Sequence, residues 1–303
     1  MEGFLNIYKP EGITSADVVR VIKRELRVKK VGYIGTLDPM ATGVLPVGMG
    51  RATKLFPFLE KDKKEYDAIM TLGSSTDTQD RTGKVLNSAD PSGITEEQVK
   101  EAMKSFAGEI EQVPPMFSAK KVQGERLYDL ARQGIEIERQ PVKVTVRDIK
   151  FISKDGEKVR FTVLVSPGTY VRTICHDMGE KLGVHAHLSD LIRTASGSFG
   201  VESSIPLDEI RGDNLEKVEK SLLSFTEALA NMSLAVVIPH AVDRIRNGMP
   251  LGVSDIVRFE HVLDNTHVRI VDKQEKLVSI GVMGGVPMAG FPFSSIQPKK
   301  VLG

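Results

Sequence analysis

The amino-acid sequence predicts an α+β fold: a mixed or antiparallel sheet flanked by helices, followed by a small all-β module. Three observations lead to this fold class. Strand-like and helix-like patterns interleave over residues 1–230 with hairpin-like pairs of strands, which favours α+β over a doubly wound sheet. From residue 231 onward, short apolar runs alternate with turn residues. The length of 303 residues suits about two domains, so we expect a body over 1–230 and a module over 231–303.

The N-terminal third of the sequence predicts a strand, a helix and a second strand. Residues 3–9 have a strand pattern, and the Pro-Glu-Gly run that follows them ends that strand. Thr14 or Ser15 caps a helix whose apolar residues recur at helical spacing. Residues 66–72 largely alternate between apolar and polar side chains, as strands do. Residues 32–50 carry too little periodicity to form one element.

The middle of the body predicts one helix and two strands. Thr95 begins a capping box in front of apolar residues at helical spacing, and Gly108 stops that helix. Residues 142–146 alternate between apolar and polar side chains, and so do residues 159–165. This alternation predicts two more strands, each with one face toward the core.

The end of the body predicts helices, and the module predicts strands. We expect a helix over residues 169–182 that ends at Gly183, because glycine commonly follows a helix C-terminus. A helical pattern over 222–229 precedes the boundary between body and module. The strands of the module are expected at residues 235–238, 256–259, 267–271 and 277–282.

The composition excludes several classes of protein. Lys and Arg number 41 and Asp and Glu 40, so the net charge of +1 excludes a uniformly basic, histone-like chain. Hydrophobic residues at 41% and charged residues at 27% exclude a disordered one. The single cysteine, Cys175, cannot form an intrachain disulfide and indicates a reducing compartment. Without a secretory signal pattern or an apolar run of about 18 residues, we expect a cytoplasmic protein that does not bind membranes.

Charge is distributed unevenly along the chain. Basic residues outnumber acidic ones in residues 1–64 and 113–172, whereas acidic residues dominate in 65–112 and 173–230. The two basic segments could fold into one positive face, which would suit a polyanion such as RNA. Ordinary mixing of surface charge explains the same pattern, so both interpretations stay open here.

The glycine-punctuated segment of residues 35–48 contains the main candidate for chemistry. Pro39 disfavours a helical conformation at Asp38, so the backbone there is expected to be extended. A carboxylate held on an apolar turn needs a cation nearby, since otherwise its pKa rises and it becomes protonated. An aspartate before proline is also a common turn former, so a purely structural role remains an alternative.

Four segments resemble motifs of one protein family. The run Gly-Thr-Leu-Asp-Pro…Thr-Gly-Val-Leu at residues 35–45 resembles the catalytic-aspartate motif of the bacterial tRNA pseudouridine-55 synthases, the TruB family. Three further segments match family motifs in the family's chain order. They are Lys9-Pro-Glu-Gly-Ile-Thr-Ser15, Lys64-Glu-Tyr66 with Thr76-Asp-Thr-Gln-Asp80, and Gly168-Thr-Tyr170-Val-Arg172-Thr-Ile174. Residues 114–120 and 127–131 also resemble the corresponding region of the family. The resemblance covers residues 3–200.

The resemblance implies roles for the catalytic residues. Asp38 is the expected nucleophile, and Arg172 is the expected partner that keeps its carboxylate ionised and oriented. A structural ion pair or a phosphate contact is the alternative for Arg172. Tyr66 is similar to the family's tyrosine that stacks on the extracted uracil and can remove a proton in later steps.

The resemblance also implies substrate-binding residues. Tyr170 and Leu191 match positions that line the uridine pocket, although Leu191 also suits the core. Lys9 either binds phosphate or braces the N-terminal motif. Tyr33 stands where the family usually has a histidine, so it can stack on a base but lacks an imidazole's hydrogen-bonding pattern.

The implied activity is the isomerisation of the uridine at position 55, in the T loop of tRNA, to pseudouridine on a flipped-out nucleotide. Attack by Asp38 at C6 of the base or at C1′ of the sugar stays open. No cofactor and no metal are expected. The family further implies a PUA-like RNA-binding tail, and an inserted arm over residues 118–140 that grips RNA. The arm's basic residues, which also suit an ordinary surface, are Lys120, Lys121, Arg126, Arg132 and Arg139.

Alternative functions come from other classes. An RNA-binding, tRNA-folding chaperone of the same fold would not need catalysis, and the tyrosine at position 33 favours it. A carboxylate glycosidase would need a second acid, which the sequence does not offer. A guide-RNA-dependent relative is possible, but the compact N-terminus and short tail favour a monomer that needs no protein partner. His185 and His187 lack a third metal ligand nearby, and adjacent Cys175 and His176 diverge on a helix.

Overall fold

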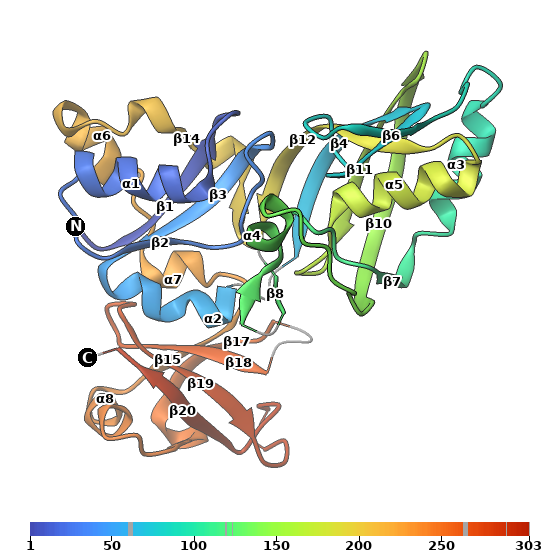
Figure 1. Ribbon diagram of the computed structural model, residues 1–303. Helices are drawn as coiled ribbons and strands as arrows, with labels where there is room; N and C mark the ends of the chain where they lie inside the picture. Colours follow the sequence, from blue (N-terminus) through green and yellow to red (C-terminus); the bar gives the residue numbers. More distant parts are fainter. Residues whose placement is uncertain (60–62, 119, 123, 263–265, 289, 303) are drawn as a thin grey trace.

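The computed structural model describes residues 1–59, 63–118, 120–122, 124–262, 266–288 and 290–302. It confirms the α+β fold class, with helices packed against a large mixed sheet and a smaller sheet at the C-terminus (Figure 1). The main strands of the large sheet are β1 Gly3–Lys9, β3 Thr42–Met49, β4 Lys64–Leu72, β7 Gly108–Gln112, β10 Val142–Asp155, β11 Lys158–Val165, β12 Ala186–Ser196 and β14 Ile205–Pro206. Their order is β14-β1-β3-β12-β4-β11-β10-β7, with β2 (Val31–Tyr33) beside β3 and β13 (Phe199–Gly200) beside β12.

The centre of this sheet is where the chain brings distant motifs together. Strand β4 alternates buried and partly exposed residues, so the predicted strand at 66–72 is confirmed. It runs antiparallel to both β11 and β12. Strand β12 is in turn parallel to β3, with Arg193 opposite Gly43. Three segments far apart in the sequence therefore meet in the middle of one sheet.

Helices cover the sheet as their sequence patterns predict. Helix α1 (Ser15–Glu25) begins with a capping box in which Thr14 bonds the backbone N–H of Asp17. Helix α3 (Glu96–Lys104) has the same device at Thr95, and α5 (Val171–Leu182) ends at Gly183 in the left-handed conformation. Helices α3 and α5 pack against each other over β10 and β12 (Figure 1).

The glycine-punctuated segment is not one element, as expected from its sequence. It consists of β2, the loop 34–41 and β3, and the two strands pair antiparallel with each other. Gly43 has a φ of +100°, and a Cβ atom there would lie 2.3 Å from the carbonyl oxygen of Arg193. Glycine is required at this position because the backbones of β3 and β12 approach closely.

The C-terminal module contains the four expected strands. Its strands are β15 Ser233–Val237, β16 Leu251–Gly252, β17 Ile256–Glu260, β18 His267–Val271, β19 Leu277–Gly284 and β20 Ser295–Val301, in the order β16-β20-β19-β18-β15-β17. The module was expected to contain strands alone, but it also contains one helix, α8 (Pro239–Arg246). Pro239 suits the first helical position, and Ala241 and Ile245 bury one side of the helix against the sheet.

The helical pattern over residues 222–229 is confirmed only in part, since only Phe225–Ala228 within it is helical. Helix α6 (Leu215–Lys220) ends earlier, and α7 (Phe225–Ala228) begins after Ser224 caps it. Between them, Leu223 donates to the carbonyl of Phe4 and accepts from its N–H, at 2.8 and 2.9 Å. The free edge of β1 thus gives Leu223 backbone partners that the local helical pattern could not reveal.

Body and module share a hydrophobic cluster. Phe4 and Leu55 from the body pack in it with Leu234 and Ile280 from the module. Helices α2 (Phe56–Leu59) and α7 lie between the large sheet and the module (Figure 1). The short 3₁₀ helices of the chain are η1 Gly50–Leu55, η2 Val201–Ser203, η3 Leu207–Glu209, η4 Gly212–Asn214 and η5 Val253–Asp255.

An insert between β7 and β10 has its own small core. It contains β8 (Lys121–Val122), β9 (Glu125–Arg126) and α4 (Leu127–Arg132), and it corresponds to the arm expected over 118–140. Met116, Leu127 and Leu130 bury their side chains together inside it. A separate hairpin, β5 (Ser74–Thr76) with β6 (Val85–Ser88), precedes α3.

Candidate active site

The loop that carries Asp38 is fixed from below by the N-terminal motif. The Ser15 hydroxyl accepts from the N–H of Leu37 at 2.9 Å and donates to its carbonyl at 3.1 Å. The N–H of Gly12 donates to the carbonyl of Pro39 at 2.8 Å. These bonds bracket Asp38 on both sides, so residues 9–15 act as the support of this loop.

Two buried cations hold the same loop from inside the protein. Lys9 Nζ donates to the carbonyls of Pro10 at 2.8 Å and Pro39 at 3.2 Å. Arg193 donates from Nη2 to Gly35 at 2.9 Å and from Nε to Val44 at 2.6 Å, which clamps both ends of the loop. Burial lowers the pKa of Lys9 to about 8, although the nearby Asp38 opposes that shift.

The position of Lys9 favours one of its two expected roles. Its side chain is fully buried and is not part of the cavity wall, so the lysine braces the loop and does not face substrate. Sequence reasoning missed Arg193 entirely. Its signal was a charged residue two positions from Leu191 on the same side of a strand, where an inward-facing apolar residue is normal.

Arg172 lies at the start of α5, where a side chain from a neighbouring strand fixes the backbone. Gln112 of β7 accepts from the N–H of Tyr170 at 3.0 Å and donates to its carbonyl at 3.1 Å. From this position the guanidinium pairs side-on with Asp38: Nε lies 3.0 Å from Oδ2 and Nη2 lies 3.2 Å from Oδ1. Such a bidentate pair fixes both the charge and the orientation of the carboxylate.

The remaining N–H groups of Arg172 also have acceptors. They donate to the carbonyls of Thr78 at 3.0 Å and Phe117 at 2.9 Å, and to Asp80 Oδ2 at 3.4 Å. Asp80, which the sequence left without a role, is itself held by the hydroxyls of Thr78 and Thr82. The guanidinium has five N–H groups in a fixed fork, and the structure uses all five.

The protonation of Asp38 is set by opposing influences. Burial raises the pKa of this carboxyl, Arg172 opposes the rise, Asp80 adds to it and Lys9 lowers it, with a net shift above the ordinary value. One third of the Asp38 side chain remains exposed, whereas Arg172 is almost completely buried at 4%. The carboxylate is therefore accessible on its free side, while the cation behind it is not.

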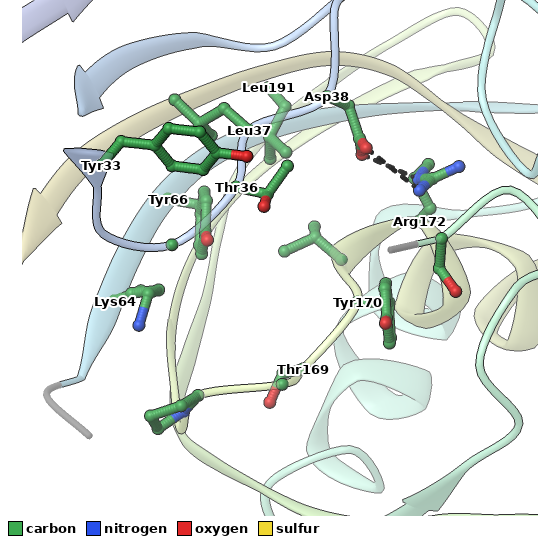
Figure 2. Close-up of a pocket in the computed structure, with 15 residues that line it drawn as sticks. Tyr33, Thr36, Leu37, Asp38, Lys64, Tyr66, Thr169, Tyr170, Arg172 and Leu191 are labelled. Carbon is green, nitrogen blue, oxygen red and sulfur yellow. Dashed lines mark hydrogen bonds and ion pairs between the residues drawn. The ribbon is translucent and has the colours of Figure 1, made fainter. Parts of the chain in front are cut away.

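Asp38 and Arg172 lie in the wall of a cavity of about 390 Å³. Figure 2 shows Tyr33, Leu191 and Tyr66 on one side of this cavity and Tyr170 on the other, with the ion pair at one end. All the predicted site residues except Lys9 line it. Lys64, on β4 two residues before Tyr66, also faces this cavity and had no predicted role.

The single cysteine and the histidines His185 and His187 lie outside this cavity. Within the described ranges, no three His, Cys, Asp or Glu side chains are grouped closely enough to hold a metal ion. His185 pairs with Glu180, and Cys175 is fully buried, which raises the pKa of its thiol. In the described parts of the chain, no helix is long and apolar enough to cross a membrane.

The basic residues expected on the arm are only partly accounted for. Arg139 donates to Glu136 at 3.0 Å and to the carbonyl of Pro114 at 3.3 Å, so it serves the insert's own structure. Lys120 is partly buried. The side chains of the other three basic residues fall outside the described residues; they are Lys121, Arg126 and Arg132.

Comparison with known proteins identifies the family of this chain. A model described as the TruB family pseudouridylate synthase N-terminal domain matches residues 23–171. A curated relative from Clostridium tetani, tRNA pseudouridine synthase B, is 43% identical over 281 residues, covering 93% of this chain and 95% of the relative. The chain belongs to the TruB family of pseudouridylate synthases. Its enzyme class is therefore that of an isomerase.

Further matches extend the similarity over most of the chain. A second model, the tRNA pseudouridylate synthase B C-terminal domain, matches residues 172–232. The Clostridium acetobutylicum tRNA pseudouridine synthase B is 44% identical, with 93% of this chain and 95% of the relative covered. A solved H/ACA RNP bound to a substrate RNA containing 2′-deoxyuridine is 27% identical, with a TM-score of 0.76, and it covers 99% of this chain and 84% of that one. The two matched regions meet inside α5, next to Arg172.

Proposed function

We propose that this protein converts the uridine at position 55, in the T loop of tRNA, to pseudouridine, with Asp38 as the nucleophile. The observation that carries the proposal is the side-on ion pair of Asp38 with a buried arginine at one end of an aromatic-lined cavity. The relatives named above are tRNA pseudouridine synthases, which supports tRNA as the substrate.

The reaction exchanges one bond of the nucleotide for another. The N1–C1′ bond breaks, the uracil rotates, and a C5–C1′ bond forms. The hydrogen on C5 leaves as a proton and N1 gains a proton, so oxidation state is unchanged and no redox cofactor is required. Asp38 adds covalently either to C6 of the base or to C1′ of the sugar, and in both cases the carboxylate has to be ionised.

The other side chains of the cavity have supporting roles. Arg172 keeps Asp38 charged and aimed, and it does this without contacting the nucleotide, since its N–H groups are occupied. Tyr66, with only 7% of its surface exposed, would stack on the flipped uracil. Base–aromatic stacking contributes about 1–3 kcal/mol, which offsets part of the free energy needed to unstack the target nucleotide. Tyr66 is also the candidate that removes the C5 proton.

Recognition of the T arm would use shape and phosphate contacts outside the cavity. The insert around α4 and the C-terminal module, which we interpret as PUA-like, are the proposed RNA-binding parts. We expect the protein to act in the cytoplasm as a monomer, without a protein partner. Because a similar chain is part of an H/ACA RNP, the activity of the protein without a partner is tested directly below.

Tritium release tests the proposal. The purified protein alone is incubated with an unmodified T stem-loop RNA that carries 5-tritiated uridine, and pseudouridine is then mapped by position. We expect release from position 55 with wild type, and no release when that uridine is replaced by cytidine. Asp38→Asn should bind the RNA and release no tritium. Wild-type protein that binds the RNA without release contradicts the proposal.

A chaperone role that does not require catalysis is the second candidate. It is favoured by Tyr33, which replaces the family's usual histidine at the cavity wall. If Asp38→Asn refolds misfolded tRNA as well as wild type does, while neither protein releases tritium, this second function replaces the first.

A further inference from the structure

The chain leaves helix α1 through a dense run of positive charges. Residues 20–30, the basic segment, contain six basic residues and one acidic residue, Glu25, so that six minus one leaves a net charge of +5. All six basic residues are exposed; they are Arg20, Lys23, Arg24, Arg27, Lys29 and Lys30. A segment with this charge attracts anions.

The fold keeps this charge on the outside of the body. Helix α1 buries Val18 and Ile22 in the core, so its opposite side faces water. Arg20, Lys23 and Arg24 lie three or four residues apart and form one stripe on the exposed side. The helix dipole favours cations in the last turn of α1, but it does not account for the basic residues that follow the helix.

Only part of the positive charge is compensated within the protein. Arg20 pairs with Asp17, and Arg24 pairs with Glu25 at 2.8 Å. Within the described ranges, the other four basic side chains have neither an ion pair nor a hydrogen bond; they are Lys23, Arg27, Lys29 and Lys30. Like charges this close repel one another, so an anion from outside the protein would relieve the repulsion.

Arg27 has a backbone conformation that does not suit arginine. Its φ of 52° lies in the left-handed region, where glycine is the usual residue after a helix and a side chain is disfavoured. Glycine would follow α1 here without this cost. The local fold therefore does not explain the arginine, and strained residues of this kind are concentrated where a side chain has a function.

A short strand connects the basic segment to the cavity. Strand β2 packs beside α1 and starts directly after Lys30 (Figure 1), and its last residue, Tyr33, lies in the cavity wall. The carbonyl of Lys30 accepts from the N–H of Gly50 at 2.8 Å, and Val31 and Tyr33 pack against the core that α1 enters. At about 3.3 Å per residue, the segment ends about 10 Å from Tyr33 and is held at that distance.

We propose that the basic segment binds backbone phosphates of the tRNA T arm while the target uridine occupies the cavity. This inference rests on the proposed function and adds an RNA-binding surface to it, besides the insert and the module. Phosphates follow one another at about 3.4 Å along the axis of a nucleic-acid strand, so those about three nucleotides from the target are within reach of the segment. Lys and Arg neutralise phosphates without reading base sequence, which suits recognition through shape and charge.

The first test neutralises the four basic side chains that have no partner among the described residues. The basic-segment variant combines Lys23→Gln, Arg27→Gln, Lys29→Gln and Lys30→Gln. A control variant also removes three lysines and one arginine, all exposed and carried by β10, β11, α5 and the hairpin of β5 and β6. It combines Lys84→Gln, Arg147→Gln, Lys158→Gln and Lys181→Gln. Binding is measured in the Asp38→Asn background, where turnover does not interfere.

The readout is the affinity for a T stem-loop as a function of salt concentration. Each phosphate contact that is lost should reduce the slope of log K against log [salt] by about 0.7–0.9. We expect the basic-segment variant to lose about 1.5 or more of this slope and to bind at least about tenfold more weakly at about 0.15 M salt. The control variant should keep nearly the slope and affinity of its parent. Unchanged binding by the basic-segment variant, or an equal loss in both variants, overturns the inference.

Rate measurements distinguish binding from chemistry. The same four substitutions in the protein with Asp38 intact should raise KM and leave the single-turnover rate at saturating RNA equal to that of wild type, because no group in the cavity is changed. A fall in that rate at saturating RNA, with KM unchanged, contradicts a role in RNA binding.

The second test locates the contact on the RNA. An uncharged methylphosphonate replaces one phosphate at a time, within about five nucleotides of the target uridine. At a contacted phosphate this should weaken binding to Asp38→Asn about threefold or more, and it should leave binding to the basic-segment variant unchanged, since one contact cannot be lost twice. Losses that are equal for both proteins at every position overturn the inference.

Arg27→Gly separates binding from folding. It should weaken RNA binding about two- to fivefold, as expected for one phosphate contact. Its Tm should be no lower than that of wild type, since glycine adopts this conformation without strain. Wild-type affinity in this variant contradicts the inference.

These readouts separate the two proposals. Wild-type turnover without any effect of the basic-segment variant leaves the proposed function intact and rejects the RNA-binding surface. Absence of wild-type turnover rejects the proposed function, while the salt dependence in Asp38→Asn still reports whether the segment contacts RNA phosphates.

Discussion

Arg172 pairs with two carboxylates at once, and this sharing affects the charge of Asp38. Asp38 takes the side-on pair, and Asp80 takes a longer bond at 3.4 Å on the opposite edge of the guanidinium. Asp80 is itself held by two threonine hydroxyls, so it fixes the arginine in place. The same negative charge raises the pKa of Asp38, which burial already raises. Asp80 therefore has two opposing effects: it holds Arg172 in position, and its negative charge makes Asp38 harder to ionise.

The charge of Asp80 should be visible in the pH dependence of the reaction. In the proposed reaction only ionised Asp38 attacks, so the rate should fall as pH drops through its pKa. Asp80→Asn removes one cause of the raised pKa, so the acidic limb of the single-turnover profile should move to lower pH. Arg172→Met removes the opposing cation and should move that limb to higher pH. The exposed Asp90→Asn is the control, and a shift of either limb in the other direction contradicts this account.

Lys9 should make stability depend on pH in the alkaline range. Burial lowers its pKa from 10.5 to about 8 in the folded protein. Between these values the unfolded chain holds a proton that the folded chain has lost, so stability rises with pH through this window. Relative to Lys9→Met, the wild type should gain at most about 3 kcal/mol in free energy of unfolding from pH 8 to 10.5. Denaturant titrations of both proteins measure this difference, and a constant difference refutes it.

At the scale of elements, the site depends on the parallel contact between β3 and β12. This contact sets Gly43 opposite Arg193, whose side chain returns to clamp the loop that holds Asp38. Strand β4, on the other side of β12, supplies Tyr66. The geometry of the candidate site is thus a consequence of how closely the three strands β3, β12 and β4 pack.

Gly43→Ala should disturb this contact. The new Cβ would collide with the backbone of Arg193 and would impose a φ of +100° on a residue that disfavours it. We expect a loss of about 2–5 kcal/mol in the free energy of unfolding. Gly93→Ala, where no atom lies within 4 Å of the added Cβ, should be nearly neutral. Chemical denaturation compares the two variants, and equal stabilities argue against the close approach.

Local sequence patterns predicted elements well where local contacts decide them. The capping boxes at Thr14 and Thr95 and the glycine at 183 mark helix ends through bonds within a few residues. At residues 222–229 the helical pattern holds only for α7, because Leu223 bonds to the distant Phe4. The helix over Pro239–Arg246 was overlooked because strand-like runs surround it.

At the scale of the whole molecule, body and module share a hydrophobic core. Phe4 and Leu55 of the body and Leu234 and Ile280 of the module are buried in the same cluster. Separating the two parts would expose this apolar surface to water, which is unfavourable. The matches to the TruB family models end at residue 232, just before the module begins.

A single unfolding transition is the expected result of this shared core. Ile280→Ala removes buried methyl groups and should lower the free energy of unfolding by about 2–5 kcal/mol. Calorimetry should show one transition that moves to lower temperature as a whole. Val286→Ala, at a side chain that is 70% exposed, should leave it unchanged. Two separate transitions, of which only one moves, would show that the module unfolds independently.

The sequence by itself determined the fold class, several of the longer helices and strands, and the family motifs that contain Asp38, Tyr66, Tyr170 and Arg172. These properties depend on residue identity and on spacing along the chain. Only the tertiary structure decided that Lys9 braces the loop, that Arg193 clamps it, and that Asp80 shares Arg172. These roles depend on distances between residues far apart in the sequence, which folding fixes and which local patterns do not encode.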